Sequence, residues 1–176
     1  ANVVVKNNEY LIKSLINSLI MAFVVISVLM GLLFKNVRMI IVSLLPNFIP
    51  LLATAGIMGY AGIALKPSTV LVFSIAFGIS IDDALHFLAK YRQELKQHNW
   101  DIPKTISVSL YETGRSMIYT SIVLFAGFSI FTLSDFGGTS ALGFLTSITL
   151  LIAMITNLVL LPSLILSFFR SREVVE

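Results

Sequence analysis

Five apolar stretches, each long enough to cross a lipid bilayer, constrain the fold of this 176-residue chain more than any other feature. They lie at about residues 15–34, 39–60, 69–88, 117–133 and 141–169. Crossing roughly 30 Å of hydrocarbon takes about 20 helical residues, so each stretch predicts a transmembrane helix. Only 12% of the residues are charged, about half the share of a soluble domain, which indicates a bilayer as the solvent. We therefore predict an all-α integral membrane protein with five transmembrane helices.

Lysine and arginine fall mainly on one side of these stretches, and this asymmetry predicts the orientation. That side carries Lys35, Arg38, Lys90, Arg92, Lys96, Lys104, Arg115, Arg170 and Arg172, whereas the opposite side carries Lys6, Lys13 and Lys66. Short cytoplasmic loops are enriched in basic residues, so the N-terminus is expected outside and the C-terminus in the cytoplasm. The expected location is the inner (plasma) membrane of a bacterial cell, crossed several times.

The loops divide the chain into three parts. Residues 1–10 are expected to be the end of an extracytoplasmic loop, residues 11–170 a five-helix membrane domain, and residues 171–176 a cytoplasmic tail. Because the chain begins without Met and without a signal-peptide pattern, we interpret it as a fragment of a longer protein. Within the membrane domain, residues 90–114 form a cytoplasmic connector. Its apolar spacing after Pro103 predicts a short amphipathic helix along the membrane surface.

Three prolines interrupt the predicted membrane helices. Pro46 and Pro50 lie inside the second helix, where each removes a backbone donor and crowds the preceding turn. In a membrane the freed carbonyl groups need other partners. The polar side chains near enough in sequence to serve are Ser43, Asn47 and Thr54. Pro162 is expected to kink or end the fifth helix.

Two adjacent aspartates, Asp82 and Asp83, lie past the midpoint of the third apolar stretch, toward its predicted cytoplasmic end. An ionisable side chain at the centre of a membrane helix costs about 2.5–3.5 kcal/mol, so a buried pair calls for a function or a partner. Neighbouring carboxylates in a low-dielectric medium repel each other, and at least one is expected to bind a proton near neutral pH. Because its protonation alters which helix packing is favoured, we predict proton-coupled transport. His86 is the candidate that continues this proton relay toward the cytoplasm.

Helical spacing places Ser74, Gly78, Asp82 and His86 on one stripe of the third helix. Gly78 has no side chain and leaves room, one turn before Asp82, for a neighbouring helix, water or a partner side chain. The alternative is a structural role, in which groups on adjacent helices hold the aspartates. The candidate partners are Thr120, Ser121, Thr156 and Asn157. A pair of aspartates after a small residue, in an otherwise apolar helix, favours the functional interpretation.

Residues 78–95 read GISIDDALHFLAKYRQEL. This segment resembles the fourth or tenth membrane helix of the resistance-nodulation-division (RND) superfamily. Within it the segment is most similar to the hydrophobe and lipid exporters of the MMPL-like group, relatives of Patched-like proteins with a sterol-sensing type of domain. That group has a glycine, then a relay aspartate, then a tyrosine or aspartate, and soon afterwards a histidine. In this chain the corresponding residues are Gly78, Asp82, Asp83 and His86. Residues 134–165 resemble the last two helices of the same group, and they read SDFGGTSALGFLTSITLLIAMITNLVLLPSLI.

The resemblance covers nearly the whole chain and implies the C-terminal half of the membrane domain, helices eight to twelve. It implies export of lipids or other hydrophobic compounds, driven by the proton motive force, with Asp82 as the relay carboxylate. The implied partners are membrane lipids, protons, a hydrophobic substrate and the N-terminal half-repeat that this chain lacks; a homo-oligomer is a further option. Because relatives place tyrosine where this chain has Asp83, a relay through a tyrosine hydroxyl is in doubt here. No cofactor or nucleic-acid partner is expected.

Other interpretations predict different behaviour. A proton-driven accessory subunit of the Sec translocase shares a similar glycine-to-aspartate helix, but that helix usually ends in another charge pattern. A non-transporting sterol or lipid sensor would bind lipid whether or not Asp82 is neutralised. An intramembrane aspartyl protease needs two carboxylates that face one water, ordinarily from separate helices, so we do not expect an enzyme. With His86 and His98 as the only histidines and no cysteine, no metal site is expected.

Overall fold

The structure, a computed structural model, describes residues 2–34 and 37–169, except the side chains of residues 2–9, 11, 12, 15, 19, 33 and 34. These residues form helices joined by short turns. In chain order they are α1 (Asn2–Phe34), α2 (Val37–Tyr60), α3 (Pro67–Gln97), α4 (Ile102–Ser109), η1 (Leu110–Gly114), α5 (Arg115–Ile130), η2 (Phe131–Leu133), α6 (Gly137–Ile155), η3 (Thr156–Leu160) and α7 (Leu161–Phe168). Because η1 and η3 are π-helical turns and η2 is a 3-10 turn, α4 to η2 and α6 to α7 form two continuous rods.

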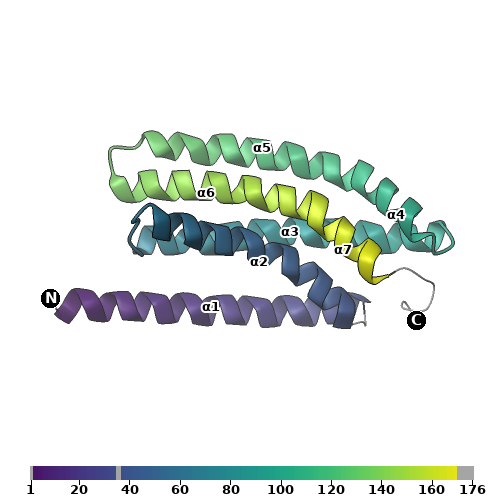
Figure 1. The fold of residues 1–176 in the computed structure, drawn as a ribbon, viewed down its shortest axis with the longest axis horizontal. Coiled ribbons are helices and arrows are strands. Elements are labelled where there is room, and N and C mark those ends of the chain that lie inside the picture. The colour runs from purple at the N-terminus through teal and green to yellow at the C-terminus, as the bar shows by residue number, and fades with distance from the viewer. Residues whose placement is uncertain (1, 35–36, 170–176) are drawn as a thin grey trace.

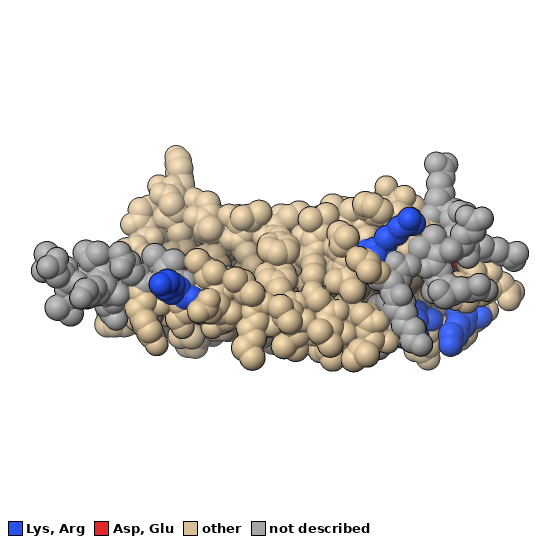
Figure 2. Space-filling model, turned by 90° about the horizontal axis from the view of Figure 1, so that it is seen from below, with Lys and Arg blue, Asp and Glu red and all other residues tan. Residues whose placement is uncertain are grey.

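Four of the described segments are long and apolar enough to cross a bilayer, namely Val37–Tyr60, Pro67–Gln97, Ile102–Leu133 and Gly137–Phe168. A shorter apolar run within α1, Ile16–Leu32, lies where the first membrane helix is predicted. The all-α, multi-pass fold is therefore confirmed, whereas the fifth span and the orientation of the termini stay predictions. Figure 2 shows Lys and Arg near the two ends of one face, separated by a wide uncharged middle. Such a band suits the hydrocarbon core of a bilayer.

The rods lie side by side, with α1 and α5 at opposite edges of the bundle (Figure 1). α6 packs against α2, α3 and α5, whereas α1 packs mainly against α2. α1 begins at Asn2, so residues 2–10 are helical and continuous with the first predicted membrane helix, and their place at the end of an extracytoplasmic loop stays a prediction. α5 meets the bundle chiefly through α6, and this arrangement leaves the facing sides of α3 and α5 apart.

The rod of α5 and η2 lies against α6 at Gly143, with no room for a side chain. A Cβ atom at this position would lie 2.7 Å from the Phe128 carbonyl oxygen and 2.8 Å from the Thr132 amide nitrogen, both backbone atoms. Small residues allow membrane helices to approach each other this closely. Gly143 therefore determines where the rod of α5 and η2 crosses α6.

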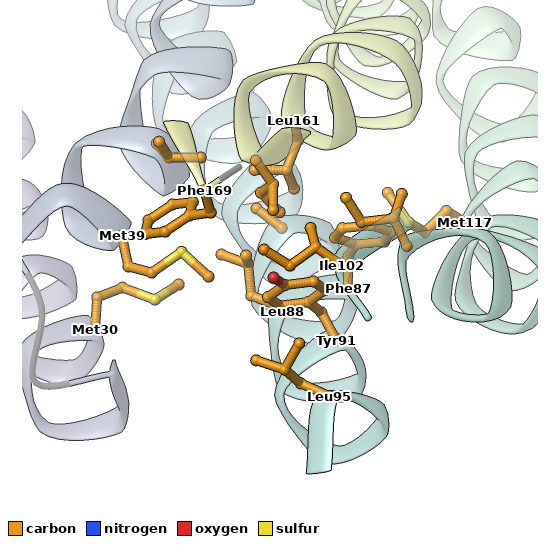
Figure 3. Packing of buried hydrophobic residues seen from close by; sticks show 14 residues of the cluster. Met30, Met39, Phe87, Leu88, Tyr91, Leu95, Ile102, Met117, Leu161 and Phe169 are labelled. Atoms are coloured by element: carbon orange, nitrogen blue, oxygen red, sulfur yellow. The ribbon is translucent and has the colours of Figure 1, made fainter. Parts of the chain in front are cut away.

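Buried apolar side chains surround the second half of α3. Figure 3 shows Phe87, Leu88, Tyr91 and Leu95 of α3 among side chains from α1, α2, α4, α5 and α7, and Phe169, which directly follows α7. Phe87, Leu88 and Tyr91 are at most 1% exposed. Since these positions follow the helical period, they turn one face of α3 inward. The polar stripe predicted from the sequence lies on the other face.

α2 stays helical through both of its prolines, Pro46 and Pro50. Hydrogen bonds of 2.7 Å run from the side chains of Ser43, Asn47 and Thr54 to the carbonyl groups of Ile40, Ser43 and Pro50, respectively. A proline frees the carbonyl four residues earlier, which here belongs to Val42 or Pro46. The expectation that these side chains bond the freed carbonyls is therefore wrong; they bond carbonyls of neighbouring residues in the same helix.

The fifth predicted helix bends rather than ends at its proline. The rod continues through Pro162 as α7, and Figure 1 shows it bending between α6 and α7. The π-helical turn η3 comes directly before this point. Prolines and π-helical turns are common causes of such bends, so the expected kink is confirmed.

The connector at residues 90–114 differs from the expected surface helix. α3 continues to Gln97, and α4 runs through η1 directly into α5. The apolar side chains of α4, Ile102 and Ile106, are buried in the same cluster as Leu95. The amphipathic pattern is real, but its apolar face packs against the protein because the turn after α3 folds α4 back onto that helix.

Candidate functional site

The predicted stripe of α3 is present and faces out of the described bundle. Ser74, Gly78, Asp82 and His86 are all exposed. The side chains of Asp82 and His86 are 70% and 72% exposed, and His86 Nε2 lies 3.5 Å from Asp82 Oδ1. Asp83 is half-buried. The expectation of two aspartates buried within this chain is therefore wrong, because the inward face of α3 is taken up by apolar and small residues.

Asp82, Asp83 and His86 line a groove between α3 and the rod of η1 and α5. Its volume is about 420 Å³. It is lined by Gly78, Ile79, Asp82, Asp83, His86, Thr113, Ser116, Met117, Thr120 and Leu124. A Cβ atom at Gly78 would meet nothing within 4 Å, as expected for a residue that leaves space beside Asp82. The groove thus places two carboxylates and an imidazole opposite three hydroxyl side chains.

Of the predicted partners, only Thr120 lies in this groove. Its hydroxyl donates to backbone carbonyls of its own helix, at 3.1 Å to Ser116 and 3.0 Å to Met117. Ser121 is buried outside the groove, and the hydroxyl of Thr156 donates to the carbonyl of Ala153. Sequence reasoning missed Thr113 and Ser116, although their spacing from Thr120 is that of one helical face.

Asn157 belongs to a different, buried polar cluster. Its Nδ2 donates to the Ser80 carbonyl oxygen at 2.8 Å and contacts Ser80 Oγ at 3.2 Å. Ser80 Oγ in turn donates to Asn47 Oδ1. All three residues are at most 1% exposed, and they join α2, α3 and η3. The expectation that Asn157 partners the aspartates is therefore wrong, because it meets α3 on the face opposite Asp82.

An ion cluster lies at the end of the groove, one turn beyond His86. Lys90 Nζ lies 2.8 Å from Glu94 Oε1 and 2.6 Å from Glu112 Oε2, and Glu94 Oε2 lies 3.3 Å from His98 Nε2. Glu112 belongs to η1, so its ion pair with Lys90 connects α3 to the segment that lines the other side of the groove. None of these pairs was predicted from the sequence, although Lys90, Glu94 and His98 follow one another at the i, i+4 spacing of one helix.

Replacing Lys90 with methionine should destabilise the protein. Glu94, whose side chain is 8% exposed, would lose its cation and η1 would lose its bridge to α3. We expect Lys90→Met to lower the thermal unfolding midpoint of the complete protein in detergent by several degrees. Lys104→Met, at an exposed lysine of α4, is the matched control and should change the midpoint little. Equal midpoints for the two variants would contradict the bridging role.

Membrane-length helices, two of which flank a groove with paired carboxylates, define the membrane domain of an integral membrane protein. The sequence profile of the MMPL family matches residues 1–175. The chain therefore belongs to the MMPL family, within the RND superfamily whose resemblance the sequence indicated.

Three relatives agree with this assignment. The chain is 30% identical to membrane protein MJ1562 of Methanocaldococcus jannaschii over 125 residues, 71% of this chain and 32% of that protein. It is 25% identical to the hopanoid transporter HpnN of Burkholderia multivorans over 150 residues, 85% of this chain and 17% of that protein. It is 25% identical to the toluene efflux pump membrane transporter TtgB of Pseudomonas putida over 144 residues, 81% of this chain and 14% of that protein. The chain thus spans less than a third of the length of these relatives, and no solved structure matches it.

Proposed function

We propose that this chain is the C-terminal membrane part of an RND-type exporter that moves lipids or other hydrophobic compounds at the expense of the proton motive force. The observation that carries the proposal is the pair Asp82 and Asp83 in one groove of a membrane-length helix, with His86 3.5 Å from Asp82. A carboxylate pair of this kind can take up a proton from one side and release it to the other. The relatives named as a hopanoid transporter and a toluene efflux pump support a hydrophobic substrate.

The openness of the groove supports a further part of this proposal. An aspartate that is 70% exposed would face lipid if nothing else covered α3 at this depth, and that arrangement is strongly unfavourable. We infer that another helical unit covers the groove, and the N-terminal half-repeat implied by the RND resemblance is our candidate. Its helices would enclose the aspartates in a water-poor space, where a change of charge acts strongly on helix packing. The proposed location is the inner (plasma) membrane of a bacterial cell.

Reconstitution of the complete protein in liposomes tests this function. A hydrophobic fluorescent substrate should cross the membrane when a pH gradient is imposed and should stop when a protonophore collapses the gradient. Addition of substrate without a gradient should move protons, which an internal pH dye reports. Substrate movement that ignores the gradient and the protonophore would contradict proton coupling. Saturable lipid binding without movement would favour the sensor interpretation instead.

A further inference from the structure

Ser80 lies on the face of α3 opposite Asp82, three residues before Asp83. Successive helical residues are about 100° apart, so Ser80 points into the bundle where Asp82 points out of it. Its side chain is 1% exposed, whereas that of Asp82 is 70% exposed. Any rotation or sliding of α3 that follows a change of charge in the groove must therefore also displace Ser80.

The partners of Ser80 belong to two membrane segments that contain helix irregularities, α2 with its prolines and the rod with the π-helical turn η3. Asn47 follows Pro46 in α2, three residues before Pro50. Asn157 lies in the π-helical turn η3, which precedes Pro162. Prolines and π-helical turns weaken the regular hydrogen-bond ladder, and helices bend at such places. Ser80 is thus hydrogen-bonded to two segments that can bend.

Asn157 retains an unused acceptor in this cluster. Its Nδ2 must face α3, because the Ser80 carbonyl oxygen can only accept a hydrogen bond. Its Oδ1 is buried and has no hydrogen-bond partner within the described part of the chain. A buried acceptor of this kind favours any rearrangement that brings a donor to it. The hydrogen bonds of the described residues thus leave one buried acceptor of the cluster without a donor.

We propose that Ser80 is a positioning residue that transmits movement of α3, driven by the charge of Asp82 and Asp83, to the bends in α2 and η3. This inference rests on the proposed function, because it describes how the groove acts on the remaining helices. Ser80 itself does not relay protons in this scheme. Its hydroxyl and carbonyl groups hold Asn47 and Asn157 in register with the aspartates, so α2 and α7 follow α3.

Transport kinetics of the complete protein test the role of Ser80. Ser80→Ala should lower the maximal export rate about tenfold and leave the half-saturating substrate concentration within about twofold. Thr149→Val is the matched control, because Thr149 and Thr54 form another buried hydroxyl pair, between α6 and α2, that does not involve α3. Its kinetics should stay within about twofold of the wild type. Equal rates for the two variants would overturn the proposal.

A triple variant separates transmission from packing. The variant with Asn47→Leu, Asn157→Leu and Ser80→Ala removes the three polar side-chain groups, keeps the branched shape of the two asparagines and leaves an apolar contact. If Ser80 only supports packing, this variant should regain the wild-type export rate, and that result would overturn the proposal. If Ser80 transmits movement, the variant should reach the membrane folded and still export slowly.

Hydrogen exchange gives a readout that needs neither transport nor a change at Ser80. The wild-type protein is compared at one pH with the variant that carries both Asp82→Asn and Asp83→Asn. We expect exchange of backbone amides at residues 43–51 and 156–161 to differ about fivefold or more between the two proteins. Unchanged exchange there would overturn the inference even if the aspartate variants fail to transport. If exchange changes there but the aspartate variant transports normally, the proposed function is wrong, whereas the inferred coupling between the groove and the bends in α2 and η3 is retained.

Discussion

The substitution Asp82→Asn or Asp83→Asn in the complete protein is expected to reduce proton-gradient-dependent export by about a hundredfold. A rate loss of this size is typical when a proton-transfer group is removed. An amide has nearly the shape of a carboxyl group but does not bind or release a proton near neutral pH. The groove would keep its lining, so the loss would report charge rather than packing. The measurement is the initial export rate in liposomes with an imposed pH gradient, at equal amounts of folded protein.

Asp135→Asn is the matched control for this experiment. Asp135 is exposed in the turn between η2 and α6, far along the chain from the groove residues. Its replacement removes one carboxylate without touching Asp82 or Asp83, and export should stay within about twofold of the wild type. Normal export by both groove variants would rule out the proton relay. Loss in only one variant would assign the coupling to that carboxylate.

A methyl group at Gly143 is expected to destabilise the protein by about 2–3 kcal/mol, a typical cost of overpacking at a close contact. The added Cβ would fall 2.7 Å from the Phe128 carbonyl oxygen and 2.7 Å from Phe131 Cβ. Backbone atoms cannot step aside as a flexible side chain can, so the rod of α5 and η2 must move away from α6. Gly143→Ala should lower the thermal unfolding midpoint in detergent and the yield of folded protein.

Gly127→Ala is the control for this second prediction. A Cβ atom at Gly127, in α5, would meet nothing within 4 Å. Alanine is a better helix former than glycine by up to about 1 kcal/mol, so Gly127→Ala should leave stability unchanged or raise it slightly. The contrast matters for function, because α5 carries Ser116 and Thr120 of the groove. Equal unfolding midpoints for the two alanine variants would show that α5 and α6 are not in close contact at Gly143.

The aspartate variants and the Gly143 variant together would separate the role of charge in the groove from the role of helix packing around it. Loss of export with intact stability is expected at Asp82 and Asp83, whereas loss of stability is expected at Gly143. If the protein is a lipid sensor, neither the wild type nor the aspartate variants should export substrate, and lipid binding should persist after Asp82→Asn. Export by the wild type together with binding but no export by Asp82→Asn would indicate a carrier that has lost proton coupling, whereas binding without export by both proteins would indicate a sensor.

The periodicity of the residues was enough to predict the helical class, the membrane segments of α2 to α7 and the stripe from Ser74 to His86. These features depend on local hydrophobicity and on helical spacing, and both can be read from neighbouring residues. The same reasoning identified Asp82, Asp83 and His86, because charged side chains stand out in an apolar helix. Their role in transport stays a prediction.

The partners of each helix face were decided by the tertiary structure alone. Spacing shows which residues share a face, but not which helix lies opposite, since residues distant in the chain meet only after packing. For this reason the sequence offers Asn157 as one of several candidate partners of the aspartates, although it bonds Ser80. The sequence likewise does not predict the bridge from Lys90 to Glu112. The close approach at Gly143 rests α5 on α6 and leaves the groove open beside α3. The outward direction of Asp82 follows from that packing, because apolar and small side chains occupy the inner face of its helix.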